Sequence, residues 1–169
     1  MLTTALRAYG VADPAEVKPM SGREFLQAMI DGRLPAPPMA RTMSFLLVEV
    51  GDGFAAFEAD AGPHLLNPLG IVHGGWALTL IDSAAGCAAH TLVPAGSSYT
   101  TVETKVNFSR PIAKDTGRVR AEGRVVGRGR RIISCEARVV DAKGRLLAHG
   151  TSTLMVLADK TEDSRPSVA

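Results

Sequence analysis

The chain has 169 residues, of which 46% are hydrophobic and 21% charged, and 19 basic against 17 acidic residues give a formal net charge of +2. This composition excludes a wholly disordered chain, and the charge balance gives no electrostatic basis for binding nucleic acid or an anionic membrane. The most apolar stretch, residues 76–92, contains Asp82 and His90 and is shorter than the ~20 residues of a spanning helix. With no signal-peptide pattern and only two cysteines, we expect a cytoplasmic protein without a disulfide framework.

Three segments divide the chain. We predict an N-terminal extension with one short helix at residues 1–40, a main domain at residues 41–157, and a flexible tail at the polar residues 158–169. In the extension, Ser21 and Glu24 have the spacing of a capping box, and the apolar residues that follow recur at helical spacing to about residue 33. Prolines at positions 35, 37 and 38 then end this helix.

The main domain begins with two predicted strands. Residues 43–50 and 54–59 flank the sequence Gly51-Asp52-Gly53, which is typical of a hairpin turn. Residues 74–92 are rich in alanine and poor in β-branched residues, which predicts one helix of four to five turns. This helix is apolar on nearly all sides, so we expect most of its surface to be buried.

Four further strands are predicted by alternation of polar and apolar residues. In the first of them, Val102, Thr104 and Val106 alternate with Thr101 and Glu103. Similar patterns follow at residues 118–125, 133–139 and 145–157. The predicted fold is α+β: a curved antiparallel sheet of about six strands around one long helix. One sheet cannot cover a helix that is apolar all round, so self-association about a two-fold axis is expected.

Asp82 is the unusual residue of the predicted helix, because it lies within an apolar run. A carboxylate removed from water without partners costs several kcal/mol or has a raised pKa, which suits a general base. The alternative is that Asp82 faces a solvated groove or caps another segment.

The second candidate site is the loop of residues 67–75, which leads into the helix through His73, Gly74 and Gly75. Free amides at a helix N-terminus stabilise negative charge, so a developing oxyanion could bind there. The structural alternative is that the glycines only end a loop and that His73 makes a structural hydrogen bond. The sequence has no G-x-S-x-G elbow, no H-E-x-x-H and no paired C-x-x-C, so we expect neither a serine hydrolase nor a metal site.

Together these motifs resemble a known family. The loop of residues 67–75, Asp82 nine residues after His73, and residues 101–111 (TVETKVNFSRP) resemble the hot-dog-fold acyl-CoA thioesterases, and in particular the phenylacetate-pathway branch called PaaI-like. The resemblance covers about residues 43–157 and leaves the first forty residues out. It implies a hydrolase that cleaves a coenzyme A thioester to a free acid and CoA, with no cofactor besides the coenzyme A of the substrate.

The resemblance also implies residue roles. Asn67 lies near the reacting carbonyl, Gly74 supplies the amide that polarises the thioester oxygen, and Asp82 activates water or attacks directly. Thr101 helps to place the water. His73 and Gly75 support the substrate loop. Three arginines of a turn that does not match a phosphate-binding loop are candidates for the nucleotide phosphates, with a solvated turn as the alternative: Arg128, Arg130 and Arg131.

Helix geometry gives an independent argument for a shared site. Gly74 and Asp82 are eight residues apart, an axial rise of ~12 Å at 1.5 Å per residue. One thioester carbon cannot contact both within the ~3 Å that proton transfer requires. The two groups must therefore come from two copies of the helix, as in a homodimer. The resemblance adds that such dimers often pair into tetramers.

Two other functions remain open at this stage. One is a hot-dog enoyl-CoA hydratase, although the chain lacks the usual histidine-bearing loop. The other is a non-catalytic acyl-CoA sensor or interaction module, although the extension contains no basic recognition helix. Trp76, Leu78 and the loop of residues 94–98 are the residues expected to shape a pocket for an aromatic, short or medium-chain acyl group.

Overall fold

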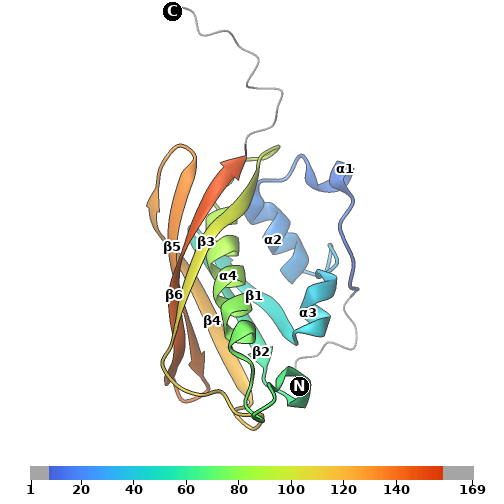
Figure 1. Ribbon diagram of the computed structural model, residues 1–169. Helices are drawn as coiled ribbons and strands as arrows, with labels where there is room; N and C mark the ends of the chain where they lie inside the picture. The colour runs from blue at the N-terminus through green and yellow to red at the C-terminus, as the bar shows by residue number, and fades with distance from the viewer. Residues whose placement is uncertain (1–7, 158–169) are drawn as a thin grey trace, which may run out of the picture.

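The computed structural model describes residues 8–157, so the predicted tail of residues 158–169 lies outside the described part. Six strands form one antiparallel sheet in the order β1-β2-β4-β5-β6-β3, and the long helix α4 lies against its concave face (Figure 1). The predicted α+β architecture is therefore confirmed. The elements are α1 (Pro14–Val17), α2 (Gly22–Ile30), α3 (Pro38–Thr42), β1 (Phe45–Gly51), β2 (Phe54–Asp60), the 3-10 turn η2 (Pro63–Leu65), α4 (Gly74–His90), β3 (Ser98–Phe108), β4 (Arg118–Arg128), β5 (Ile132–Asp141) and β6 (Leu146–Leu157).

Helix α4 packs closely on the sheet because glycines in the strands remove the side chains at the contact. A Cβ atom built on Gly123 of β4 would lie 2.1 Å from the carbonyl oxygen of Ala84. The alanines of α4 that face the sheet are completely buried: Ala77, Ala84, Ala85, Ala88 and Ala89. Small residues on both surfaces therefore let the two backbones approach and hold α4 in a fixed position.

The outward side of α4 is the part of this largely buried helix that carries polar residues. The residues of α4 that are not buried include five that are related by steps of three and four, and three of the five are polar: Leu78, Thr79, Asp82, Ser83 and Cys87. This spacing places them on one face of the helix. Asp82 therefore projects from the side of α4 that faces away from the sheet centre rather than into the hydrocarbon core.

Strand β3 lies at one edge of the sheet and pairs only with β6 among the described strands. The pairing register shifts between Thr101 and Glu103, so Val102 is the extra residue of a β-bulge. Beyond the bulge the alternation of side chains is inverted relative to a regular strand. As a result Thr101 and Thr104, which regular alternation would put on opposite faces, both point toward α4.

The N-terminal extension packs over one margin of the sheet, where Figure 1 shows α2 and α3 beside β1. The predicted capping box is confirmed, since the Ser21 hydroxyl accepts from the Glu24 amide and the Glu24 carboxylate accepts from the Ser21 amide. Helix α2 ends at Ile30, and the prolines that follow it lead into α3, a short helix that the sequence analysis did not predict. The Phe25 ring stacks on His90 with ring centroids 5.5 Å apart, which joins α2 to the last turn of α4.

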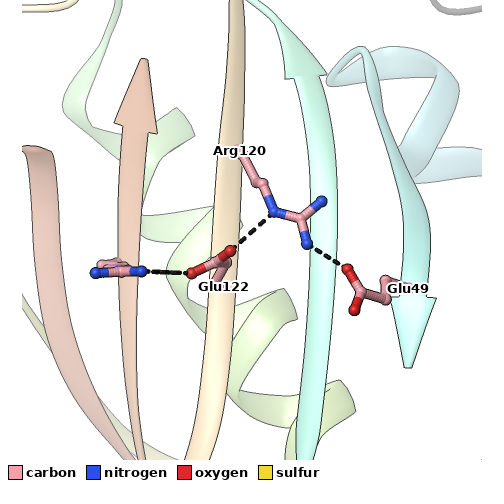
Figure 2. A network of polar contacts seen from close by, with 4 residues as sticks. Glu49, Arg120 and Glu122 are labelled. Atoms are coloured by element: carbon pink, nitrogen blue, oxygen red, sulfur yellow. Dashed lines mark hydrogen bonds and ion pairs between the residues drawn. The ribbon is translucent and has the colours of Figure 1, made fainter. Parts of the chain in front are cut away.

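The outer face of the sheet, away from α4, is charged. Glu49 of β1, Arg120 and Glu122 of β4 and Arg138 of β5 form a row of ion pairs across the strands, shown in Figure 2. The Arg120 guanidinium bonds to Glu122, which lowers the pKa of that carboxyl. A surface of this kind stays hydrated. Exposed apolar side chains on the α4 and β3 side include Leu78, Val102 and Phe108.

Candidate active site

Asp82 is held by two threonines of the bulged strand. Its Oδ1 atom accepts hydrogen bonds from the hydroxyls of Thr101, at 3.1 Å, and Thr104, at 3.0 Å. Within the part of the chain that the structure describes, the second oxygen, Oδ2, has no hydrogen-bond partner. The carboxylate is thus fixed through one oxygen and can accept a proton from a bound molecule through the other.

Ser152 extends this arrangement into the sheet. Its hydroxyl lies 2.9 Å from that of Thr104 and 3.1 Å from the carbonyl oxygen of Glu103, and the residue is buried at 1% exposure. Thr104 donates its one hydrogen to Asp82, so the single hydrogen of Ser152 serves either the Glu103 carbonyl oxygen or the Thr104 oxygen. Ser152 thus links Thr104 to the backbone of β3.

The start of α4 presents a single open amide. His73 is the N-cap residue, and its Nδ1 atom accepts from the Gly75 amide at 2.8 Å. The Trp76 amide donates to the His73 carbonyl oxygen at 3.0 Å. Of the first three amides of α4, only that of Gly74 lacks a partner among residues 8–157. His73 therefore stabilises the helix start, while Gly74 offers a donor at the positive end of the helix dipole.

Asn67 lies in the loop before this helix start. Its Oδ1 atom accepts from the amides of Leu69 and Ile71, at 2.9 Å and 3.3 Å, which closes the loop on itself. The side-chain oxygen is thereby committed, and the NH₂ group is the part that can donate to a ligand. Asn67 and Gly74 line one cavity together with Phe108 and Arg110, so both residues border the same space.

Asp82 lies in a different cavity, of about 210 Å³, together with Ser83, Cys87 and Tyr99. No residue lines both this cavity and that of Gly74. The structure therefore brings Thr101 to Asp82 and Asn67 to Gly74, but it keeps the two pairs apart on one chain.

Burial makes the surroundings of Asp82 strongly apolar. It raises the pKa of the Cys87 thiol to about 12, with a smaller contribution from the Asp82 charge. It also raises the pKa of Tyr99 above its usual range. Both groups are therefore neutral at pH 7 and do not act as nucleophiles there.

The other predicted residues lie elsewhere. Arg128 ends β4, and Arg130 and Arg131 lie in the turn before β5; all three are exposed and line neither cavity. Trp76 was expected in an acyl pocket, but this is wrong: it is buried at 1% exposure and its indole donates to the Met43 carbonyl oxygen at 2.8 Å. Leu78 is exposed and lines neither cavity.

Two residues at the site were missed by sequence reasoning, Thr104 and Ser152. The alternating pattern placed Thr104 on the apolar face of its strand, where a hydroxyl is unusual, and that was the available signal. Ser152 could not be found in this way, because its partner lies 48 positions away in the sequence. In the same described segment, no three His, Cys, Asp or Glu residues cluster as metal ligands, and no helix is long and apolar enough to span a membrane.

Comparisons with known proteins show the family to which the chain belongs. The sequence model of the thioesterase superfamily matches residues 69–148, which include Gly74, Asp82 and both threonines. The proofreading thioesterase EntH of Klebsiella pneumoniae is 32% identical over 98 residues, which are 58% of this chain and 69% of EntH. The chain belongs to the thioesterase superfamily. As a member it is a thioester hydrolase, and the predicted family is confirmed.

Solved structures support the same assignment and the hot-dog fold. A phenylacetic acid degradation-related protein of Ralstonia eutropha JMP134 is similar with a TM-score of 0.71 and 26% identity, over 78% of this chain and 98% of that one. A mutant of the phenylacetic acid degradation protein PaaI of Thermus thermophilus is similar with a TM-score of 0.63 and 26% identity, over 70% of this chain and 97% of that one. The predicted likeness to the phenylacetate-pathway branch is thus confirmed.

Proposed function

We propose that this thioesterase hydrolyses acyl-CoA thioesters at a site shared by two copies of the chain. Asp82 of one protomer activates the attacking water, and Gly74 and Asn67 of its partner polarise the thioester carbonyl. The observation that carries the proposal is the Asp82 carboxylate itself, fixed by two threonine hydroxyls through Oδ1 and open at Oδ2. A carboxylate that is held through one oxygen and can accept a proton through the other can serve as a general base.

The proposed reaction uses water and groups of the chain. Asp82 takes a proton from water while the water oxygen bonds to the thioester carbon. The Gly74 amide and the Asn67 NH₂ group donate to the oxyanion, and each such donor contributes roughly 3 kcal/mol. The carbon–sulfur bond then breaks, and the proton held by Asp82 passes to the leaving thiolate, so the products are the free acid and CoA. In the alternative route Asp82 bonds to the thioester carbon, the carbon–sulfur bond breaks and the CoA thiolate leaves, and water then hydrolyses the resulting anhydride.

The surface on the α4 and β3 side supports a two-fold dimer. Strand β3 leaves one row of backbone groups unpaired along its edge, and it carries two exposed apolar side chains, Val102 and Phe108, each 59% exposed. Leu78 of α4 is also exposed on this side. An open edge beside apolar side chains favours pairing with a second copy. Antiparallel helices in that dimer bring Asp82 of one copy toward Gly74 of the other.

Two features guide the choice of substrates. Arg128, Arg130 and Arg131 are the proposed contacts for the CoA phosphates, since guanidinium groups bind phosphate through paired hydrogen bonds. Two structural relatives have names from phenylacetic acid degradation, which makes phenylacetyl-CoA a first candidate. Straight-chain acyl-CoA thioesters complete the panel.

The function is tested by thiol release from this panel with the parent protein, Asp82→Asn and Asp82→Ala. We expect both variants to lose at least ~100-fold in turnover while they keep the circular dichroism spectrum of the parent, because each removes the base. Equal turnover in parent and variants would refute the role of Asp82. Hydration of an enoyl-CoA without thiol release would instead favour a hydratase.

The sharing of the site is tested by mixing two inactive variants, Asp82→Asn and Asn67→Ala. In a mixed dimer one site receives both altered residues and the other receives neither. Random exchange of subunits is expected to restore about one quarter of the parent activity, since half of the dimers are mixed and each has one intact site. Activity that stays absent although mixed dimers are detected would refute the shared site.

A further inference from the structure

Part of the cavity beside Asp82 is lined by residues outside the segment that matches the thioesterase model. The thioesterase model covers residues 69–148. The cavity is also lined by four residues of the N-terminal extension: Met29 of α2, Ala36, and Met39 and Ala40 of α3. Phe45 and Phe57 from β1 and β2 close its other side. The extension thus closes a space that α4 and the sheet alone would leave open.

The cavity is apolar except at one point. Asp82 and Ser83 enter it from the outward face of α4, and the remaining lining is formed by hydrocarbon, aromatic and thioether side chains with Cys87 and Tyr99. Both of these last groups are neutral at pH 7. A ligand that fills the cavity therefore packs its apolar part against the extension, and the end of the ligand that reacts lies at the Asp82 carboxylate.

A second apolar cavity lies behind the first. It measures about 260 Å³ and shares four lining residues with the cavity of Asp82: Met29, Pro37, Cys87 and Tyr99. These four form the partition between the two spaces. Met29 is the long, flexible member of the four, with three rotatable side-chain bonds, so it decides whether the spaces join.

We propose that the N-terminal extension forms the acyl-binding pocket and that Met29 limits the length of the acyl group. This inference rests on the proposed function, because the occupant is the acyl part of the thioester that Asp82 cleaves. A cavity of about 210 Å³ holds about seven groups of water size at ~30 Å³ each. The substrate class is therefore an uncharged, apolar acyl group of about six to eight carbons, aliphatic or aryl.

The pocket is tested with S-alkyl-CoA thioethers, which bind but cannot be hydrolysed. Isothermal titration calorimetry measures the affinity of the parent for the ethyl, hexyl, octyl and dodecyl compounds. We expect the affinity to rise about fourfold for each added methylene and to level off near octyl, because each buried methylene contributes a similar transfer free energy. A parent whose affinity does not depend on chain length, or which binds none of the four, would overturn the pocket.

Two variants and one control test the partition. Met29→Ala is expected to bind the dodecyl compound at least ~10-fold more tightly than the parent does, since the joined cavities accept the longer chain. Met39→Trp, at a half-exposed position, is expected to weaken octyl binding at least ~10-fold and to leave ethyl binding unchanged. Met20→Ala is the matched control, because Met20 is a half-buried methionine of the extension that lines neither cavity.

The outcomes separate the two proposals. Unchanged profiles in a folded Met29→Ala and in Met39→Trp would overturn the inference even if the protein hydrolyses every acyl-CoA. Shifted binding profiles without any thiol release from the corresponding thioesters would support the pocket and refute the hydrolysis of acyl-CoA. Phenylacetyl-CoA and octanoyl-CoA, compared in the thiol-release assay, then distinguish an aryl from an aliphatic substrate.

Discussion

Thr104→Val is the sharpest test of how the carboxylate is held. Valine has nearly the shape of threonine but cannot donate, so Asp82 keeps Thr101 as its one donor, at 3.1 Å. A hydrogen bond to a charged group contributes about 1.5–3 kcal/mol, which corresponds to a loss of about 10-fold to 150-fold in kcat/KM. The fold should tolerate the change, because the Ser152 hydroxyl can still donate to the Glu103 carbonyl oxygen.

The assay is thiol release under steady-state conditions, with kcat and KM determined separately. We expect kcat to fall and KM to change little, since Thr104 acts through Asp82 and does not line the cavity. Thr104→Ser restores the donor and should recover most of the activity. Thr100→Val is the matched control, because Thr100 is an exposed residue of the same strand with no side-chain contact to Asp82. Full activity in Thr104→Val would refute the positioning role.

Two further predictions concern stability. Burial lowers the pKa of His90 from 6.5 to about 4, so the unfolded chain takes up the proton first as the pH falls. The free energy of unfolding should therefore decrease by about 3 kcal/mol between pH 6.5 and 4, and His90→Phe should flatten this dependence in urea titrations; an unchanged slope would contradict the reasoning. Gly123→Ala places a Cβ 2.1 Å from the Ala84 carbonyl oxygen and should cost about 3 kcal/mol in urea unfolding. Gly127→Ala, on the same strand with open space around it, should change stability by less than ~0.5 kcal/mol, and equal effects of the two would refute the packing argument.

The long helix and the strands were predictable because their signals are local. Alanine content and the scarcity of β-branched residues marked α4, which begins at Gly74 as predicted and ends at His90, two residues earlier than expected. Alternation marked the strands, and Ser21 and Glu24 marked the start of α2. Each of these features is decided within a few residues of the chain, so a single sequence contains the information.

The chemistry around Asp82 depended on contacts between distant segments. Regular alternation separates Thr101 from Thr104, and only the pairing of β3 with β6 inserts the bulge at Val102 that turns both toward the carboxylate. The burial of Trp76 depended in the same way on a hydrogen bond to the Met43 carbonyl, 33 positions away.

The sequence by itself determined the elements, the family motifs and the conclusion that Gly74 and Asp82 are too far apart on one helix to act on one carbon. The tertiary structure decided which hydroxyls hold Asp82, which edge of the sheet is open, and that the extension closes the cavity beside the carboxylate. The physical reason is that strand register and the docking of α2 and α3 are fixed by side-chain packing across the whole domain, which no local pattern of residues specifies.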